Sequence, residues 1–143
     1  GKGVLTLNAA RAQGVSGLLN TVGAVETRDL RIRSAMALGH IVLVSLDDQP
    51  LASSGKMLLQ VMSEEKETNR QVEQVAENVQ RLVNIGTDPW VVKEFQGTVQ
   101  LKRADAAQLK VTALDLNGYP VGPAGTANAI ALQPATMYYL LAR

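Results

Sequence analysis

Two short apolar runs joined by a polar connection constrain the fold of this chain more than any other feature. The runs are residues 41–46 and 57–61, and Asp, Gln, Pro, Ser and Gly residues lie in the connection between them. Each run is shorter than a typical helix and is bounded by residues that favour turns. The first run opens with IVLV, which is typical of a strand covered on both faces. We therefore expect two central strands of one packed sheet.

Short strands with turn signals between them recur along most of the chain. The tetrapeptide LRIR at residues 30–33 alternates apolar and cationic side chains, which predicts a half-buried strand with its arginines facing water. Asn117-Gly118 is the strongest turn signal, because a tight hairpin needs positive φ at both positions. No β-α-β alternation is present. The pattern predicts an all-β fold, an antiparallel β-sandwich of about 9–11 short strands.

Residues 63–84 depart from this pattern. Val72, Val75, Val79 and Leu82 follow a polar run at a 3-4-3 spacing, which places them on one face if the segment is helical. The β-branched residues lower helix propensity, whereas the Glu, Ala and Arg residues among them raise it. We expect one long loop or short helix near 63–84 at the edge of the sandwich. The alternative is an irregular excursion that contains pieces of strand.

Composition and charge limit the functions that this chain can have. A chain of 143 residues is long enough for one domain with a substantial core. The 14 Lys and Arg residues nearly balance the 13 Asp and Glu residues, so the net charge of +1 indicates neither a nucleic acid nor a membrane as partner. The absence of cysteine excludes disulfides and thiolate metal sites. No apolar run has the roughly 18 residues that indicate a membrane span.

Residue types that form common active sites are sparse. His40 is the single histidine and precedes an apolar strand, so we expect it to be structural and predict neither a Ser-His-Asp triad nor a zinc site. The carboxylate pairs Asp47-Asp48 and Glu64-Glu65 stand in turn-like or hydrated contexts. Glycoside hydrolysis needs two carboxylates that converge on one bond. We therefore predict no catalytic residue.

One segment resembles the beginning of a calcium loop. It starts at Asp115 and Asn117, but Tyr119 and Pro120 stand where further ligands would be needed. A hairpin turn explains these residues. A structural calcium ion is compatible with a β-sandwich, but the sequence predicts no metal site and no cofactor.

Aromatic side chains are the best candidates for a binding function. Sugar rings stack their apolar C–H face on exposed Trp and Tyr rings. Trp90 follows a turn and Tyr119 lies on a predicted hairpin, so we expect both to face solvent. Tyr138 and Tyr139 are neighbours on a strand, so one faces in and one faces out, and Tyr139 is the third candidate. The 3% aromatic content makes a broad platform hard to build, and the alternative for Trp90 is that it closes one end of the core.

Four segments carry a resemblance that covers most of the chain. They are GVLTLNAARAQGVSGLL at 3–19, IVLVSLDDQPLASSGKMLLQV at 41–61, NIGTDPWVVKEFQGTVQLKR at 84–103 and VTALDLNGYP at 111–120. In content and order they resemble the C-terminal accessory β-sandwich domain of bacterial glycoside hydrolases, a domain that is carbohydrate-binding-module-like. Residues 66–82 depart from that family because they are more helix-like.

The resemblance implies a single accessory domain at 1–143, excised from a larger glycoside hydrolase whose catalytic carboxylates lie in a preceding barrel. The start at Gly1, with neither an initiator Met nor a signal peptide, agrees with such a piece. The resemblance also implies a bacterial, secreted protein in an extracellular or periplasmic location. No sugar-binding residue carries over by motif, so Trp90, Tyr119 and Tyr139 rest on exposure and chemistry.

The sequence therefore leads to one prediction and two alternatives. The prediction is a non-catalytic carbohydrate-binding module that targets a glycoside hydrolase to polysaccharide of the plant cell-wall β-glucan or xylan type. Its partners would be the polysaccharide and the catalytic domain of the parent chain. One alternative is a purely structural domain that braces the catalytic barrel without a ligand. The other is a small free-standing hydrolase, which would need two carboxylates in a cleft.

Overall fold

The computed structural model describes residues 3–143 and divides into two compact units. Unit 1 contains the chain up to Ser63 together with Glu94–Arg143, and unit 2 is Glu64–Lys93. The described residues form fifteen strands and two 3-10 helices, η1 (Leu19–Thr21) and η2 (Ala106–Gln108). The all-β antiparallel fold is confirmed, with more strands than the about 9–11 expected from turn spacing. No helix in this part of the chain has the length and apolar character needed to cross a membrane.

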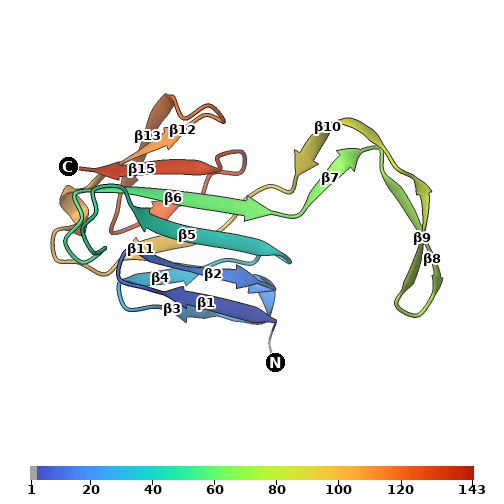
Figure 1. Ribbon diagram of the computed structural model, residues 1–143, viewed down its shortest axis with the longest axis horizontal. Helices are drawn as coiled ribbons and strands as arrows, with labels where there is room; N and C mark the ends of the chain where they lie inside the picture. The colour runs from blue at the N-terminus through green and yellow to red at the C-terminus, as the bar shows by residue number, and fades with distance from the viewer. Residues whose placement is uncertain (1–2) are drawn as a thin grey trace. The chain divides into compact units, whose positions relative to one another are not determined.

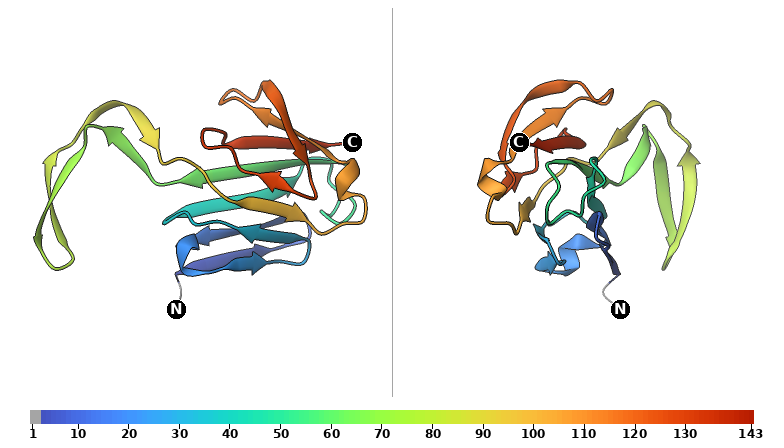
Figure 2. Two further views of the ribbon diagram at one scale, coloured as in Figure 1. Left: turned by 180° about the vertical axis from the view of Figure 1, so that it is seen from behind. Right: turned by 60° about the vertical axis from the view of Figure 1, so that its left-hand side comes forward.

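Unit 1 is a sandwich of two antiparallel sheets (Figure 1, Figure 2). In spatial order, the seven-stranded sheet consists of β1 (Val4–Asn8), β2 (Ala12–Gly17), β5 (Gly39–Ser45), β6 (Lys56–Ser63), β15 (Tyr138–Ala142), β12 (Lys110–Leu114) and β13 (Pro120–Thr126). The four-stranded sheet consists of β14 (Ile130–Ala131), β11 (Thr98–Leu101), β4 (Leu30–Arg33) and β3 (Ala24–Glu26).

The pair β5 and β6 forms the centre of the larger sheet, as the sequence predicts. Leu43 faces Leu59 across this pair, and both side chains are buried. The expectation that residues 41–46 are covered on both faces is wrong, because burial alternates along β5 and Val42 and Val44 are only partly buried. Successive side chains of a strand point to opposite faces, so these two valines lie on the outer face of the sheet.

The smaller sheet is held on the core by alternate residues of β4 and β11. The buried residues are Leu30, Ile32, Val99 and Leu101, and the outward residues are Arg31, Arg33, Thr98 and Gln100. Full burial of one large aliphatic side chain contributes about 1.5–3 kcal/mol. The buried side chains of each strand therefore fix the position of the outward polar side chains, which face solvent. The backbone of each strand is paired on both sides.

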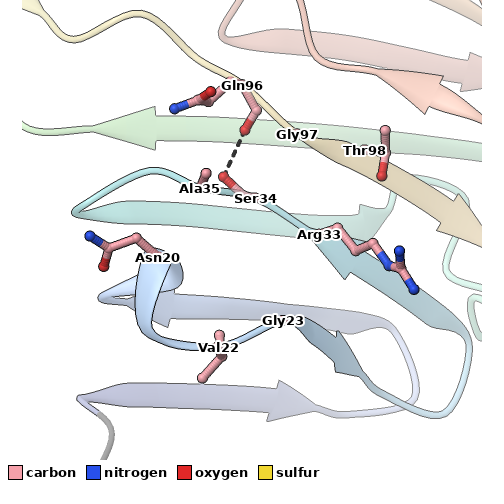
Figure 3. A pocket seen from close by; sticks show the side chains of 9 residues that line it. All are labelled: Asn20, Val22, Gly23, Arg33, Ser34, Ala35, Gln96, Gly97 and Thr98. Atoms are coloured by element: carbon pink, nitrogen blue, oxygen red, sulfur yellow. Dashed lines mark hydrogen bonds between the residues drawn. The ribbon is translucent and has the colours of Figure 1, made fainter.

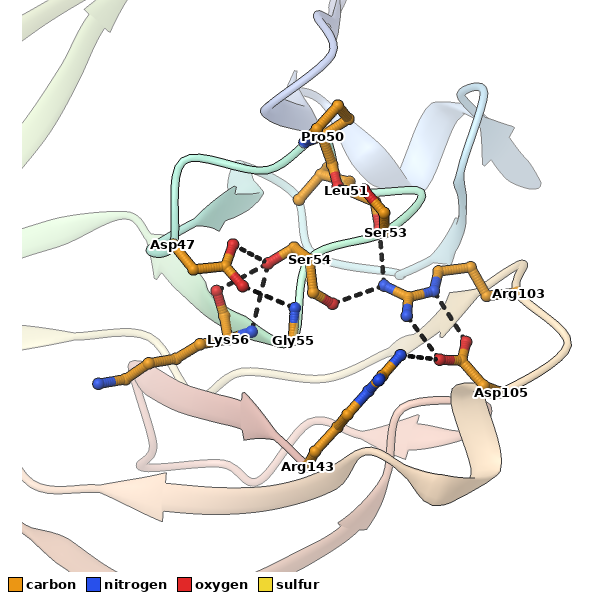
Figure 4. Close-up of polar contacts among 10 residues, drawn as sticks. All are labelled: Asp47, Pro50, Leu51, Ser53, Ser54, Gly55, Lys56, Arg103, Asp105 and Arg143. Atoms are coloured by element: carbon orange, nitrogen blue, oxygen red, sulfur yellow. Dashed lines mark hydrogen bonds and ion pairs between the residues drawn. The ribbon is translucent and has the colours of Figure 1, made fainter.

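A buried arginine organises the connection between β5 and β6 (Figure 4). The Arg103 side chain is 7% exposed, and its Nη1 donates hydrogen bonds to the carbonyl oxygens of Leu51 and Ser54 at 2.8 and 2.7 Å. Its Nε and Nη2 donate to the two carboxylate oxygens of Asp105, which also accepts from Arg143. The guanidinium thus joins the connection to the last part of the chain.

The carboxylate of Asp47 holds the two ends of the same connection together. It accepts hydrogen bonds from the hydroxyl of Ser54 and the backbone N–H of Gly55, each at 2.7 Å, and from the hydroxyl of Ser45 at 2.9 Å. These donors, Ser54 first, hold the pKa of Asp47 well below its usual range. A carboxylate with so many internal donors stabilises the loop.

Unit 2 consists of two antiparallel pairs of strands. β7 (Glu65–Thr68) pairs with β10 (Thr87–Val92), and β8 (Gln71–Ala76) pairs with β9 (Val79–Asn84). Every residue of β8, β9 and β10 is exposed. Two-stranded ladders have no second layer of their own to cover them.

The expectation of one long loop or short helix near 63–84 is wrong, and the alternative with strand pieces is closer to the structure. Asn69 and Asn78 have positive φ of 62° and 61° and lie in turns, which interrupt any helix. Val72 faces Leu82 across the ladder, and Glu73 forms an ion pair with Arg81. The apolar residues spaced for a helix therefore belong to two different strands.

Candidate functional site

The outer face of the four-stranded sheet carries polar side chains in matched positions. Thr98 lies opposite Arg33, and Gln100 lies opposite Arg31, in the antiparallel register of β11 and β4. Side chains in such register stand about 4.5–5.5 Å apart at Cβ. Four hydrogen-bonding groups from two segments distant in sequence are thus brought together on one rigid surface.

This face contains three adjoining hollows, which together we call the groove. Their volumes are about 420, 320 and 350 Å³. The first is lined by Asn20, Val22, Gly23, Arg33, Ser34, Ala35, Gln96, Gly97 and Thr98 (Figure 3). The second is lined by Arg31, Arg33, Thr98 and Gln100, and the third by Thr98, Val99, Gln100, Asn128, Ala129 and Ala131. Shared lining residues place the hollows next to one another from β4 across β11 to β14.

The first hollow combines amide, hydroxyl and guanidinium groups. Figure 3 shows Arg33 and Thr98 on adjacent strands at one side and the amides of Asn20 and Gln96 at the other. The hydroxyl of Ser34 donates a hydrogen bond to the carbonyl oxygen of Gln96 at 2.6 Å and so joins the segments that follow β4 and precede β11. An amide both donates and accepts, and a guanidinium donates only. The hollow can therefore bind a ligand that carries both hydrogen-bond donors and hydrogen-bond acceptors.

The two arginines of β4 differ in their charged neighbours. Arg31 lies opposite Glu26, with 3.5 Å between Nε and Oε1, and Glu26 also pairs with Lys102 at 3.3 Å. Arg33 lies opposite Ala24 and Thr98, which carry no charge. The face therefore holds three cations and one carboxylate among these residues.

The structure contradicts the prediction that Tyr139, one of the three aromatic candidates, is an exposed sugar-binding residue. Its side chain is 0% exposed, and its hydroxyl accepts a hydrogen bond from the backbone N–H of Gln133 at 2.7 Å. It lies opposite Leu59, a core residue, whereas its neighbour Tyr138 is only partly buried. The alternation prediction for the two tyrosines is correct, but the inward one is Tyr139, so its ring offers no surface to a sugar.

Trp90 and Tyr119 are both exposed, at 57% and 69%. Trp90 lies on β10 of unit 2, so the alternative that it closes the core is wrong. Tyr119 follows the turn between β12 and β13, where the Asp115 carboxylate accepts from the backbone N–H groups of Asn117 and Tyr119. Of the Asn117-Gly118 pair, Gly118 has positive φ, at 86°, rather than both residues. Neither exposed ring lines the groove, and their binding roles stay predictions.

The other candidate groups have local structural partners. His40 Nδ1 lies 2.7 Å from the hydroxyl of Ser16, which faces it across β2 and β5. Glu64 forms ion pairs with Lys66 and Lys93 at 2.7 and 2.6 Å, which lower its pKa to about 2. Within residues 3–143, no group of three or more His, Cys, Asp or Glu residues is placed to hold a metal ion.

Sequence reasoning did not identify the groove as a candidate site. Its signal is present as the alternations LRIR at 30–33 and TVQL at 98–101, which place the outward residues correctly. The pairing of these two segments, and therefore the position of Arg33 beside Thr98, comes from the sheet order.

Comparisons of this chain with protein-family models, with curated proteins and with solved structures found no match. The resemblance to glycoside hydrolase accessory domains therefore stays a prediction.

Proposed function

We propose that this chain is a non-catalytic carbohydrate-binding module and that the groove is its binding site. The observation that carries the proposal is the row of three adjoining hollows lined by amide, hydroxyl and guanidinium groups. A polysaccharide presents rows of hydroxyls that both donate and accept hydrogen bonds, and this lining offers partners of both kinds. Each hollow falls within the roughly 300–1,000 Å³ of common ligand pockets. Their arrangement side by side suits consecutive units of a polymer.

The position of the site on central strands favours specific binding. β11 pairs with β14 and β4, and β4 pairs with β11 and β3, so both backbones are held from two sides. The backbones therefore keep the groove side chains at fixed spacings along the sheet. This fixed spacing supports recognition of a ligand through polar contacts.

In the parent protein, such a module would hold a glycoside hydrolase on its polysaccharide. This part of the proposal rests on the resemblance, which also implies an extracellular or periplasmic location and plant cell-wall β-glucan or xylan as ligand. Trp90 and Tyr119 add exposed rings on which a sugar could stack. They are secondary candidates because neither lines the groove.

The proposal is tested by removing one amide from the groove. The Gln100→Ala variant should weaken binding of the recognised polysaccharide roughly 2- to 10-fold, the effect of one neutral hydrogen bond, in isothermal titration calorimetry. Gln60→Ala is the matched control, since Gln60 is an exposed glutamine on β6 of the other sheet. Equal affinities of the two variants would contradict the assignment of the groove.

A second candidate function, a bracing domain, is favoured by the apolar surface of unit 2. Its exposed large apolar residues are Val72, Val75, Val79, Leu82, Val83, Ile85, Trp90, Val91 and Val92. Soluble proteins rarely leave large contiguous apolar patches uncovered, and isolated two-stranded ladders are marginally stable in water. On this reading, unit 2 packs against the catalytic domain of the parent chain, and Trp90 is an interface residue.

Trp90 fluorescence separates the two roles of unit 2. Trp90 is the only tryptophan in the sequence, so its emission reports on unit 2. If the ring stacks on sugar, saturating polysaccharide should shift its emission and protect it from acrylamide quenching. If unit 2 only braces another domain, the emission of Trp90 should stay unchanged at every polysaccharide concentration, whether or not calorimetry detects binding in the groove.

The hydrolase alternative receives no support from the charged groups. Asp47, Glu64 and Asp105 all have lowered pKa values because hydrogen-bond donors or cations surround them. A general acid in glycoside hydrolysis needs a raised pKa so that it keeps its proton. These carboxylates are therefore suited to structural roles.

A further inference from the structure

We infer that the groove prefers acidic polysaccharides and that Arg33 binds the carboxylate of a uronic acid unit. This inference rests on the proposed function and names the ligand class of the same site. It starts from the unequal surroundings of the two arginines on β4.

The register of the sheet gives Arg31 a carboxylate partner and gives Arg33 none. Arg31 lies opposite Glu26, whereas Arg33 lies opposite Ala24 at the next outward position of the same pair of strands. On its other side Arg33 faces the hydroxyl residue Thr98. Opposite charges commonly face each other across strands because they stabilise the pair. Within residues 3–143, the structure gives the guanidinium of Arg33 no ion pair of this kind.

Arg33 also occupies the junction of the groove, because it lines both the first and the second hollow. Small residues surround it there, among them Gly23 and Ala35. A Cβ atom built on Gly23 would meet no other atom within 4 Å, so this side of the hollow is open. A ligand can therefore approach the guanidinium without moving the backbone.

The chemistry of the site suits a carboxylate that is carried on a sugar. A guanidinium binds a planar carboxylate through two parallel hydrogen bonds. The neighbouring Asn20, Gln96 and Thr98 side chains can then bind hydroxyls of the same or the adjacent sugar. Arg31, Arg33 and Lys102 outnumber Glu26 on this face, so the local field attracts a polyanion although the whole chain has a net charge of only +1.

The decisive experiment compares polymers that differ only in their carboxylates. Polygalacturonate, alginate and glucuronoxylan would each be titrated into the protein in native and in carboxyl-reduced form. We expect at least one native polymer to bind about 10- to 100-fold more tightly than its reduced form, the range for hydrogen bonds to a charged group. Arg33→Gln should remove this difference. Arg11→Gln removes the same charge at an exposed site that pairs with Asp48, and should leave the difference intact.

A second variant guards against an indirect effect of Arg33→Gln on folding. Gly23→Phe places a ring in open space at the first hollow and needs no positive φ. It should abolish binding of the acidic polymer while the far-UV circular dichroism spectrum stays unchanged. Retained binding in this variant would overturn the position of the carboxylate site.

The remaining outcomes separate the inference from the proposed function. Equal affinity for native and reduced polymers, together with weaker binding in Gln100→Ala, would overturn the uronate preference and leave the binding module intact. Tighter binding of a sulfated glucan than of every uronate polymer would overturn the carboxylate assignment. A folded protein that binds none of these polymers, nor neutral β-glucan or xylan, would overturn both.

Discussion

Unit 1 and unit 2 both consist of antiparallel strands rich in apolar residues, but they bury those residues very differently. In β5 and β6, alternate side chains such as Leu43 and Leu59 are fully buried between two sheets. In β8 and β9, Val72 and Leu82 face each other across a ladder and both remain about half exposed. The difference shows that pairing strands is not enough, since apolar strands gain most of their stability from a second layer.

The same difference separates the functions proposed for the two units. The core of unit 1 fixes the outward residues of β4 and β11, so its polar face can be a binding site. Unit 2 exposes apolar side chains instead, which favours contact with another domain. Its charged residues, such as Glu73 and Arg81, pair with each other along the ladder.

The largest expected effect comes from making the same Leu→Ala substitution once in each unit. Leu59 is 0% exposed and Leu82 is 49% exposed. Leu59→Ala should lower the free energy of unfolding by about 2–5 kcal/mol, because it removes a buried side chain and leaves a cavity. Leu82→Ala should change it by about 0.5 kcal/mol or less, as is usual at exposed positions. Urea denaturation of both variants measures the difference, and similar losses would mean that unit 2 is covered in solution.

A matched pair of arginines gives a smaller effect. Arg103→Gln should cost about 1–3 kcal/mol, because it leaves the carbonyl oxygens of Leu51 and Ser54 without their buried donor. Arg81→Gln in unit 2 removes an exposed ion pair with Glu73 and should cost about 1 kcal/mol or less. Thermal unfolding with van't Hoff analysis compares them. A larger loss of stability in Arg81→Gln than in Arg103→Gln would mean that the exposed ion pair matters more than the buried hydrogen bonds of Arg103.

The parts of the fold that sequence could predict are those where burial follows a local period. The alternation at 30–33 and the apolar runs at 41–46 and 57–61 each predict their strands, because one face of a sheet must be apolar. The prediction for segment 63–84 is wrong because a 3-4-3 spacing fits a helix as well as two strands joined at a turn. The turn at Asn78 decides between them, and nothing in the apolar period marks it.

The parts that sequence could not predict depend on which face of a strand points inward and on how strands pair with one another. Two adjacent tyrosines must face opposite ways, but the choice of Tyr139 as the inward one comes from its partner Leu59 on β6. The groove depends in the same way on the pairing of Arg33 with Thr98. Such pairings join residues far apart in the chain, and a single sequence carries no direct signal for them.

Acid unfolding gives the smallest effect and the sharpest test of whether the two units unfold separately. Arg103 and Arg143 lower the pKa of Asp105 to about 2 in unit 1, and Lys66 and Lys93 lower that of Glu64 to about 2 in unit 2. Both folded-state values lie below the unfolded values of about 3.9 and 4.3. The unfolded state therefore binds more protons in this range, so each group contributes stability above pH 4 that is lost as the pH falls toward 2.

Two conservative variants remove these contributions one at a time. Asp105→Asn should flatten the loss of far-UV circular dichroism between pH 4 and pH 2, because most strands belong to unit 1. Glu64→Gln should instead flatten the change in Trp90 fluorescence over the same range, because both residues belong to unit 2. If either variant altered both signals equally, the two units would unfold as one, and the exposed apolar surface of unit 2 would then be part of a single cooperative structure.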